Sequence, residues 1–75
     1  MNLHIKAFAT LGRFLPENPE AYEAPEGITV GSLADQLRIP EEELHLIFVN
    51  GRRAERSQSL QPGDRVGFFP AVGGG

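Results

Sequence analysis

Apolar and polar residues alternate at the start of the chain, and apolar residues return at helical spacing near its middle. Every second residue from position 3 to position 9 is small or aliphatic: Leu3, Ile5, Ala7 and Ala9. An alternation of period two predicts a half-buried strand over residues 2–10. Phe8 departs from the pattern because it places an aromatic ring on the polar face.

Turn-forming residues divide the rest of the N-terminal third. Gly12 and Pro16 predict a loop over residues 11–18. Residues 20–24 are expected to pair back with the first strand around Tyr22, which gives an N-terminal hairpin.

A short helix is predicted to begin at Thr29. Its hydroxyl suits the N-cap position, where it accepts a hydrogen bond from a free amide of the first turn. An apolar stripe at positions 30, 33 and 37 predicts a helix that ends near Arg38 and packs against a sheet. A single acidic turn over residues 41–43 is expected after Pro40.

A second hairpin is predicted around Asn50 and Gly51. These residues follow the apolar run 46–49, and the Asn-Gly pair favours the type I′ turn that joins two antiparallel strands. A short return strand is therefore expected from Arg52.

The last strand is predicted over residues 66–69. Pro62 and Gly63 suit the two central positions of a type II turn before it, and Pro70 closes it. Two strands, one main helix and further strands, in that order, predict an α+β roll with the helix across one face of a mixed sheet. Residues 1–70 form the predicted domain, and residues 71–75 a flexible C-terminal glycine tail.

The composition disfavours several classes of function. The 75 residues suffice for one small domain but leave little room for a deep catalytic cleft. The chain has no cysteine, and His4 and His45 are isolated, so no metal site is expected. No serine has the Gly-x-Ser-x-Gly setting of an activated nucleophile, which makes an enzyme acting alone the least favoured class. No stretch approaches the ~20 apolar residues of a membrane span, so a cytoplasmic protein is expected, without membrane contact.

The charge distribution bears on possible partners. The net charge of −3 argues against binding to a nucleic-acid backbone. Four arginines nevertheless gather in the last third of the chain: Arg52, Arg53, Arg56 and Arg65. An acidic partner surface is one use for this end, although solvated side chains on the outside of a small domain are the simpler interpretation for most of the charges.

The three glycines at positions 73–75 call for an explanation other than folding. Glycine loses more backbone entropy on ordering than any other residue. A run without side chains can thread a narrow channel and present the carboxylate of Gly75 to another protein's active site. A frayed end, or residues left from cloning, would show the same run. The position directly after a strand and Pro70 favours the extended arm.

The sequence resembles the ubiquitin-like sulfur carriers of the MoaD/ThiS type over its whole length. The likeness rests on segments that occur in the family's order: Phe8-Ala9, Thr29-Val30 with Leu33 and Leu37, Val49-Asn50-Gly51, Leu60, Pro62-Gly63-Asp64, Phe68-Phe69-Pro70-Ala71-Val72, and Gly74-Gly75. The Phe-Phe-Pro stretch is most similar to the small subunit of molybdopterin synthase. Ala71, where that subunit often has a second proline, and Gly73, which is more typical of thiamin-pathway carriers, leave the pathway open.

The resemblance implies a β-grasp (ubiquitin-like) fold and a mechanism. An E1-like adenylyltransferase, using ATP and Mg, adenylates Gly75, and a sulfur donor converts it to a thiocarboxylate. A sulfur-accepting synthase, such as the large subunit of molybdopterin synthase, then receives the sulfur. The carrier is a cosubstrate or a non-catalytic small subunit, and it binds no cofactor itself. Gly73 and Gly74 thread into the partner.

A partner-binding face is predicted from strand alternation. Val66 and Phe68 share one face, so Phe69 points the other way, as Phe8 does on the first strand. Exposed aromatic rings are common binding anchors. With Pro70 and Val72, these two rings are expected to bind the activating enzyme and the synthase, unless the rings only cover each other or the neighbouring loop.

Three alternatives share the fold. The first is a sulfur carrier of the thiamin pathway. The second is a protein modifier that is joined to lysine amines, and the third is a protein-interaction module with a passive tail. A residue appended after Gly75 should be tolerated by the interaction module only. The sulfur donor, the oligomeric state and the permanence of any complex are not indicated by the sequence.

Overall fold

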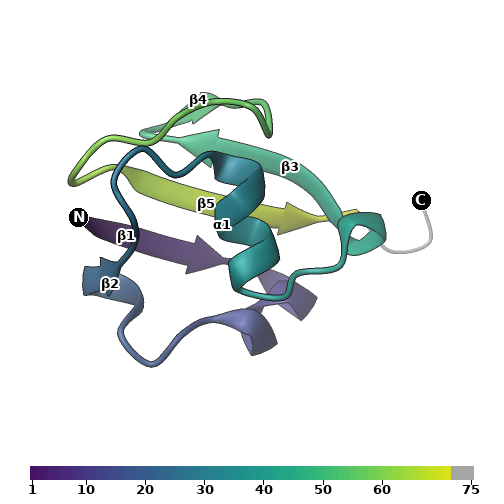
Figure 1. The fold of residues 1–75 in the computed structure, drawn as a ribbon. Helices are drawn as coiled ribbons and strands as arrows, with labels where there is room; N and C mark the ends of the chain where they lie inside the picture. The colour runs from purple at the N-terminus through teal and green to yellow at the C-terminus, as the bar shows by residue number, and fades with distance from the viewer. Residues whose placement is uncertain (72–75) are drawn as a thin grey trace.

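The structure, a computed structural model, describes residues 1–71 (Figure 1). Val72 and the three glycines after it lie outside the described residues. The elements follow one another as β1 (Asn2–Ala7), the 3₁₀ helices η1 (Ala9–Phe14) and η2 (Pro19–Ala21), β2 (Tyr22–Glu23), α1 (Val30–Gln36), the 3₁₀ helix η3 (Glu41–Glu43), β3 (Leu44–Val49), β4 (Arg52–Arg53) and β5 (Arg65–Pro70).

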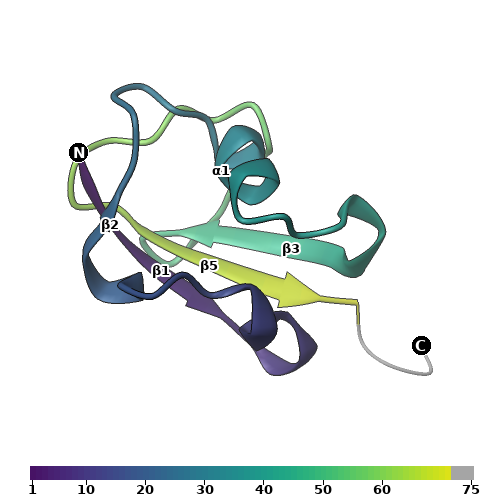
Figure 2. The same ribbon diagram turned by 60° about the horizontal axis from the view of Figure 1, so that its bottom comes forward.

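The strands form one mixed sheet in the order β2-β1-β5-β3-β4. The central pair β1 and β5 is parallel, and the other three pairs are antiparallel. Helix α1 crosses one face of this sheet, as Figure 1 and Figure 2 show. The predicted α+β roll of the β-grasp type is therefore confirmed. No helix in the described part of the chain is both long and apolar enough to cross a membrane.

The core lies between α1 and the sheet. The helix contributes Val30, Leu33 and Ala34, all fully buried. The three long strands contribute alternate residues: Leu3, Ile5, Ile47, Val49, Val66 and Phe68. The period-two and helical patterns of the sequence therefore meet in one apolar layer.

The first strand is shorter than predicted. It ends at Ala7, and Phe8 continues the pairing with one hydrogen bond, from its amide to the carbonyl oxygen of Phe68 at 3.0 Å. Ala9 then adopts a positive φ of 51°, which turns the chain into η1. The predicted strand over residues 2–10 and loop over residues 11–18 are wrong here, because the turn carries Leu11 into the core, where it is fully buried.

The predicted turns and helix start are confirmed. Asn50 and Gly51 both have positive φ, 52° and 82°, as a type I′ turn requires, and Gly63 has a φ of 85°. Asn50 joins the two turns, since its Nδ2 donates to Asp64 Oδ1 at 2.9 Å and its Oδ1 accepts from the Arg65 amide at 2.9 Å. β2 pairs with β1 as expected, with Tyr22 opposite Leu3.

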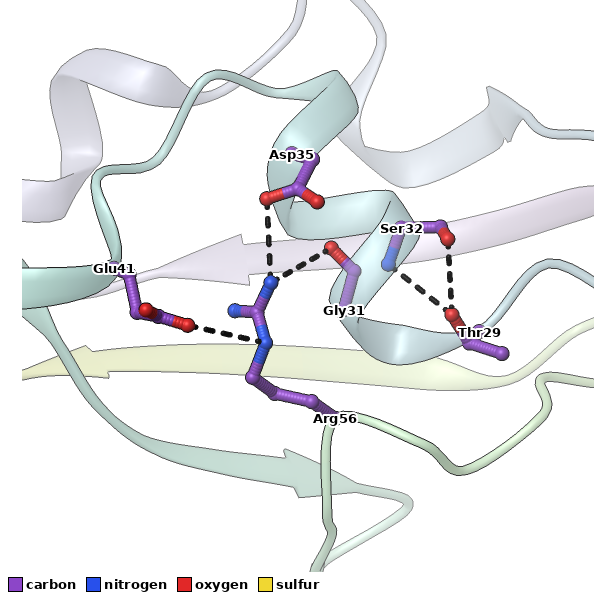
Figure 3. A network of polar contacts seen from close by, with 6 residues as sticks. All are labelled: Thr29, Gly31, Ser32, Asp35, Glu41 and Arg56. Atoms are coloured by element: carbon purple, nitrogen blue, oxygen red, sulfur yellow. Dashed lines mark hydrogen bonds and ion pairs between the residues drawn. The ribbon is translucent and has the colours of Figure 1, made fainter.

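Arg56 holds α1 against the chain between β4 and β5 (Figure 3). Its carbonyl oxygen accepts a hydrogen bond from the Gly31 amide at 2.8 Å. Its guanidinium donates to Asp35 Oδ1 at 3.2 Å and lies 3.7 Å from Glu41 Oε1. A Cβ at Gly31 would lie 3.1 Å from that carbonyl oxygen, a tighter contact than usual, so any larger residue would push the two segments slightly apart.

Substituting Thr29→Ala tests the helix start. The Thr29 hydroxyl accepts a hydrogen bond from the Ser32 amide at 3.2 Å (Figure 3). Its loss is expected to lower the free energy of unfolding by about 1 kcal/mol, or the unfolding temperature by roughly 4–8 °C. Thr29→Ser keeps the acceptor and should retain most of the stability in a thermal melt. Equal stability of all three proteins would show that this cap contributes nothing.

Candidate functional site

The face of the sheet opposite α1 carries the predicted binding residues. Val66 and Phe68 are buried in the core at 1% and 0% exposure. Successive strand residues point to opposite faces, so Gly67 and Phe69 lie on the face away from the helix. On β3, Phe48 lies between buried Ile47 and Val49 and therefore also points to that face.

Three aromatic rings form what we call the aromatic face: Phe8, Phe48 and Phe69. The rings of Phe8 and Phe69 are stacked, with centroids 4.2 Å apart and an interplanar angle of 10°. Phe48 meets Phe69 edge-on, with centroids 5.4 Å apart. Phe8 and Phe69 therefore do cover each other in part, yet 40% of the Phe8 surface stays exposed. Such an arrangement leaves a continuous aromatic surface for a partner.

The aromatic face surrounds a hollow of about 320 Å³. Its floor is Gly67, which lies opposite Lys6 on β1 and opposite Phe48 on β3. The side chains of Lys6 and Arg65 stand at its rim. The ion pairs among residues 1–71 are made elsewhere, by Met1, Arg13 and Arg56. The hollow is thus apolar inside and positively charged at its edge.

Pro70 ends β5 opposite Leu44 of β3 and follows Phe69 directly. The aromatic face is therefore next to the point at which the described chain runs out. Val72, Gly73, Gly74 and Gly75, the other predicted site residues, lie outside the described residues. The structure brings Phe8, Phe69 and Pro70 to one end of the sheet.

Phe48 was not identified from the sequence. The run 46–49 is apolar throughout, so alternation gives no indication of which residue faces the core. The short return strand gives a partial clue, since Arg53 pairs with Phe48 across the hairpin and an exposed charge indicates the solvent side. Gly67 was also missed, because a glycine inside a strand is visible in a sequence but its neighbours on adjacent strands are not.

The other features of residues 1–71 offer less chemistry. No group of three or more potential metal ligands is brought together in this part of the chain. Within the same residues, no polar or charged side chain is buried. A second pocket of about 210 Å³, beside the outer edge of β3, is lined by two glutamates, two arginines and a histidine: Glu41, Glu55, Arg53, Arg56 and His45. Its charges balance, unlike those around the aromatic face.

Comparison with solved structures identifies similar folds of the same size. A putative molybdopterin converting factor, subunit 1, from Pyrococcus furiosus is 29% identical with a TM-score of 0.75, covering 96% of this chain and 99% of that one. A thiamine biosynthesis protein from Geobacter metallireducens is 26% identical with a TM-score of 0.63, covering 100% and 88%. SAMP1 from Haloferax volcanii shares the fold over 100% of both chains, with a TM-score of 0.72 and 21% identity.

Comparison of sequences gives the family. No curated protein matches the chain. The family model described as the ThiS family matches residues 5–75, which includes the whole aromatic face and the terminal glycines. The chain belongs to the ThiS family of ubiquitin-like sulfur carriers.

Proposed function

We propose that this protein carries sulfur as a thiocarboxylate on Gly75 and delivers it in cofactor biosynthesis, most directly in the synthesis of molybdopterin. The observation that carries the proposal is the match to the ThiS family through residue 75. The aromatic face supports it, since a carrier must be recognised by an activating enzyme and by a sulfur acceptor.

The chemistry requires two steps at the carboxyl group of Gly75, the first at an oxygen and the second at the carbonyl carbon. A carboxylate is a poor electrophile, so an oxygen of Gly75 first attacks the α-phosphorus of ATP, and pyrophosphate leaves. Hydrosulfide, or the outer sulfur of a protein persulfide, then adds to the acyl carbon, and AMP leaves. With a persulfide donor, a thiol reductant cleaves the sulfur–sulfur bond and leaves the thiocarboxylate.

Delivery returns the carrier to its starting state. The thiocarboxylate sulfur attacks an electrophilic carbon of the acceptor and displaces an oxygen group from it, and water then cleaves the carbon–sulfur bond to Gly75 and regenerates the carboxylate. ATP and Mg are bound by the activating enzyme and not by this chain. The carrier then acts as a cosubstrate, or as a small subunit of the synthase, without catalysing either step itself.

The other predicted site residues recognise the partners and guide the tail into the active site. Phe8, Phe69 and Pro70 bind the partners and place the chain end, while Gly73 and Gly74 thread into the active site and Val72 contacts its entrance. Glycine suits the threading part because the backbone can then approach a channel wall closely. The 1–70 body thus provides recognition and the 71–75 tail provides the reactive group.

Molybdopterin synthesis and the thiamin pathway are the two candidate destinations of the sulfur. The structure of the Pyrococcus molybdopterin converting factor is more similar than the Geobacter thiamine biosynthesis protein, both in TM-score and in identity, and the Phe69-Pro70 stretch agrees with it. The family model described as ThiS keeps the thiamin pathway as the second candidate. The protein-modifier and passive-module alternatives have the fold alone in their favour.

The first test of the proposal is ATP–pyrophosphate exchange. The chain is incubated with purified adenylating enzymes of the E1-like class, Mg-ATP and labelled pyrophosphate. Exchange that requires the chain, and that is lost when one alanine is appended after Gly75, supports activation of the terminal carboxylate. Full exchange with the extended chain would exclude chemistry at Gly75.

A further inference from the structure

Gly67 occupies a position that the fold does not reserve for glycine. Its φ is not in the left-handed region, in contrast to Gly51 and Gly63 in the two tight turns. A Cβ built at Gly67 would lie 3.5 Å from both the Phe8 and the Phe69 ring, an ordinary contact distance. Alanine would therefore fit without displacing either ring, and it would lose less backbone entropy in the strand than glycine does. Neither the backbone conformation nor a clash of Cβ requires glycine here.

The missing side chain creates the hollow in the aromatic face. Gly67 lies between Lys6 and Phe48 in one row across the sheet, with the stacked pair of Phe8 and Phe69 next to that row. Glycine inside a strand commonly marks a place where a ligand or another chain approaches closely. The hollow has room for a branched aliphatic side chain.

The charges at the rim indicate what surrounds that side chain. Lys6 and Arg65 are exposed on the same face, no carboxylate lines the hollow, and neither cation has an acidic partner within residues 1–71. Such a concentration of positive charge on a protein of net charge −3 is complementary to an acidic surface. A nucleic acid is disfavoured, because two cations provide few phosphate contacts and the Phe8 and Phe69 rings already stack on each other.

We propose that Gly67 forms a notch for one aliphatic side chain of a protein partner, and that Lys6 and Arg65 pair with carboxylates flanking that side chain. The partner we infer is the adenylating enzyme, and this identification alone rests on the proposed function. The notch provides shape selectivity and the rim provides charge selectivity, so partners without both features are rejected.

Capped pentapeptides test the proposal without enzyme or ATP, so its failure is separate from a failure of the carrier function. The first peptide has a leucine between two glutamate pairs, the second replaces leucine by glycine, and the third replaces the glutamates by lysines. A thymidine octanucleotide is the nucleic-acid probe. Each is titrated into the ¹⁵N-labelled full chain, and backbone amide shifts are followed by NMR.

We expect the leucine–glutamate peptide to shift the amides of Lys6, Phe48 and Gly67 and their neighbours, and the other three probes to bind at least about tenfold more weakly. Gly67→Val should weaken binding of the first peptide by at least about tenfold while the protein stays folded. Gly67→Ala adds only a methyl group and fills the hollow partly, so it should weaken binding to a smaller degree. It replaces the valine variant in this test if that variant misfolds.

The rim is tested by the pair Lys6→Glu and Arg65→Glu, with Arg38→Glu and Arg52→Glu as a control of equal charge change at exposed positions outside the hollow. Only the first pair should remove binding and its dependence on salt. The proposal would be overturned if both Gly67 variants bound the first peptide undiminished, or if the leucine-free peptide bound equally well. It would also be overturned if the shifts lay outside the hollow, if only the oligonucleotide bound, or if no probe caused any shift.

Discussion

Deletion of Gly75 is expected to abolish activation of the carrier while leaving its fold intact. The core residues of the described part, residues 1–71, all lie between Leu3 and Phe68, and Gly75 has no side chain that could add to this core. Removing it places the carboxylate about 3.5 Å short of its position in the partner's active site. Misplacement of a reacting group by even ~1 Å costs about 100-fold in rate, so ATP–pyrophosphate exchange should fall by at least that factor.

Two controls make this deletion informative. A urea unfolding curve of the shortened chain should superimpose on that of the natural one. Gly75→Ala keeps the length but adds a methyl group, and it therefore separates the reach of the tail from the width of the channel. Unchanged exchange by the shortened chain, or a loss of folding in it, would contradict the division into a recognition body and a reactive tail.

Phe68→Ala and Phe69→Ala are expected to have opposite consequences although the two residues are neighbours in β5. Phe68 is completely buried, and its truncation should cost about 3–5 kcal/mol of unfolding free energy. A domain of this size has roughly 4–11 kcal/mol in total, so the variant should be largely unfolded on modest heating. Phe69 is partly exposed and loses mainly its ring contacts, worth about 1 kcal/mol.

Binding should show the reverse order. As the central ring of the aromatic face, Phe69 is a candidate hot spot, whose truncation typically costs at least about 2 kcal/mol of binding free energy. The apparent affinity of Phe69→Ala for the adenylating enzyme, measured by isothermal titration calorimetry, should therefore fall by about 30-fold while the protein remains folded. Normal affinity of a folded Phe69→Ala protein would remove the aromatic face from the account.

Local sequence signals were sufficient for much of the fold. The Thr29 cap, the Asn50-Gly51 turn and the turn at Gly63 each depend on a few adjacent residues, and all three are present as predicted. The 3₁₀ helix η1 was not predicted, because its one anchor, Leu11, has no periodic partners in the sequence. Its burial depends on the packing of the whole domain.

The candidate site was likewise predictable only where single strands determine it. Alternation along single strands correctly placed Phe8 and Phe69 on the open face, but the notch requires the pairing of Lys6, Gly67 and Phe48 across three strands. That row depends on the parallel pairing of β1 with β5 and on the register of β3 against β5, neither of which has a local signal. The contacts of Arg56 with Gly31 and Asp35 likewise join segments far apart in the chain.

The intact mass of the protein after incubation with an E1-like adenylating enzyme, Mg-ATP and a sulfur donor tests the carrier function most directly. We expect a mass increase equal to the difference between one sulfur and one oxygen atom, located by fragmentation on Gly75 and absent without ATP. The protein with one residue appended after Gly75 should show no change. An unaltered mass of the natural chain, under conditions in which the same enzyme activates another carrier, would contradict the assignment as a thiocarboxylate carrier.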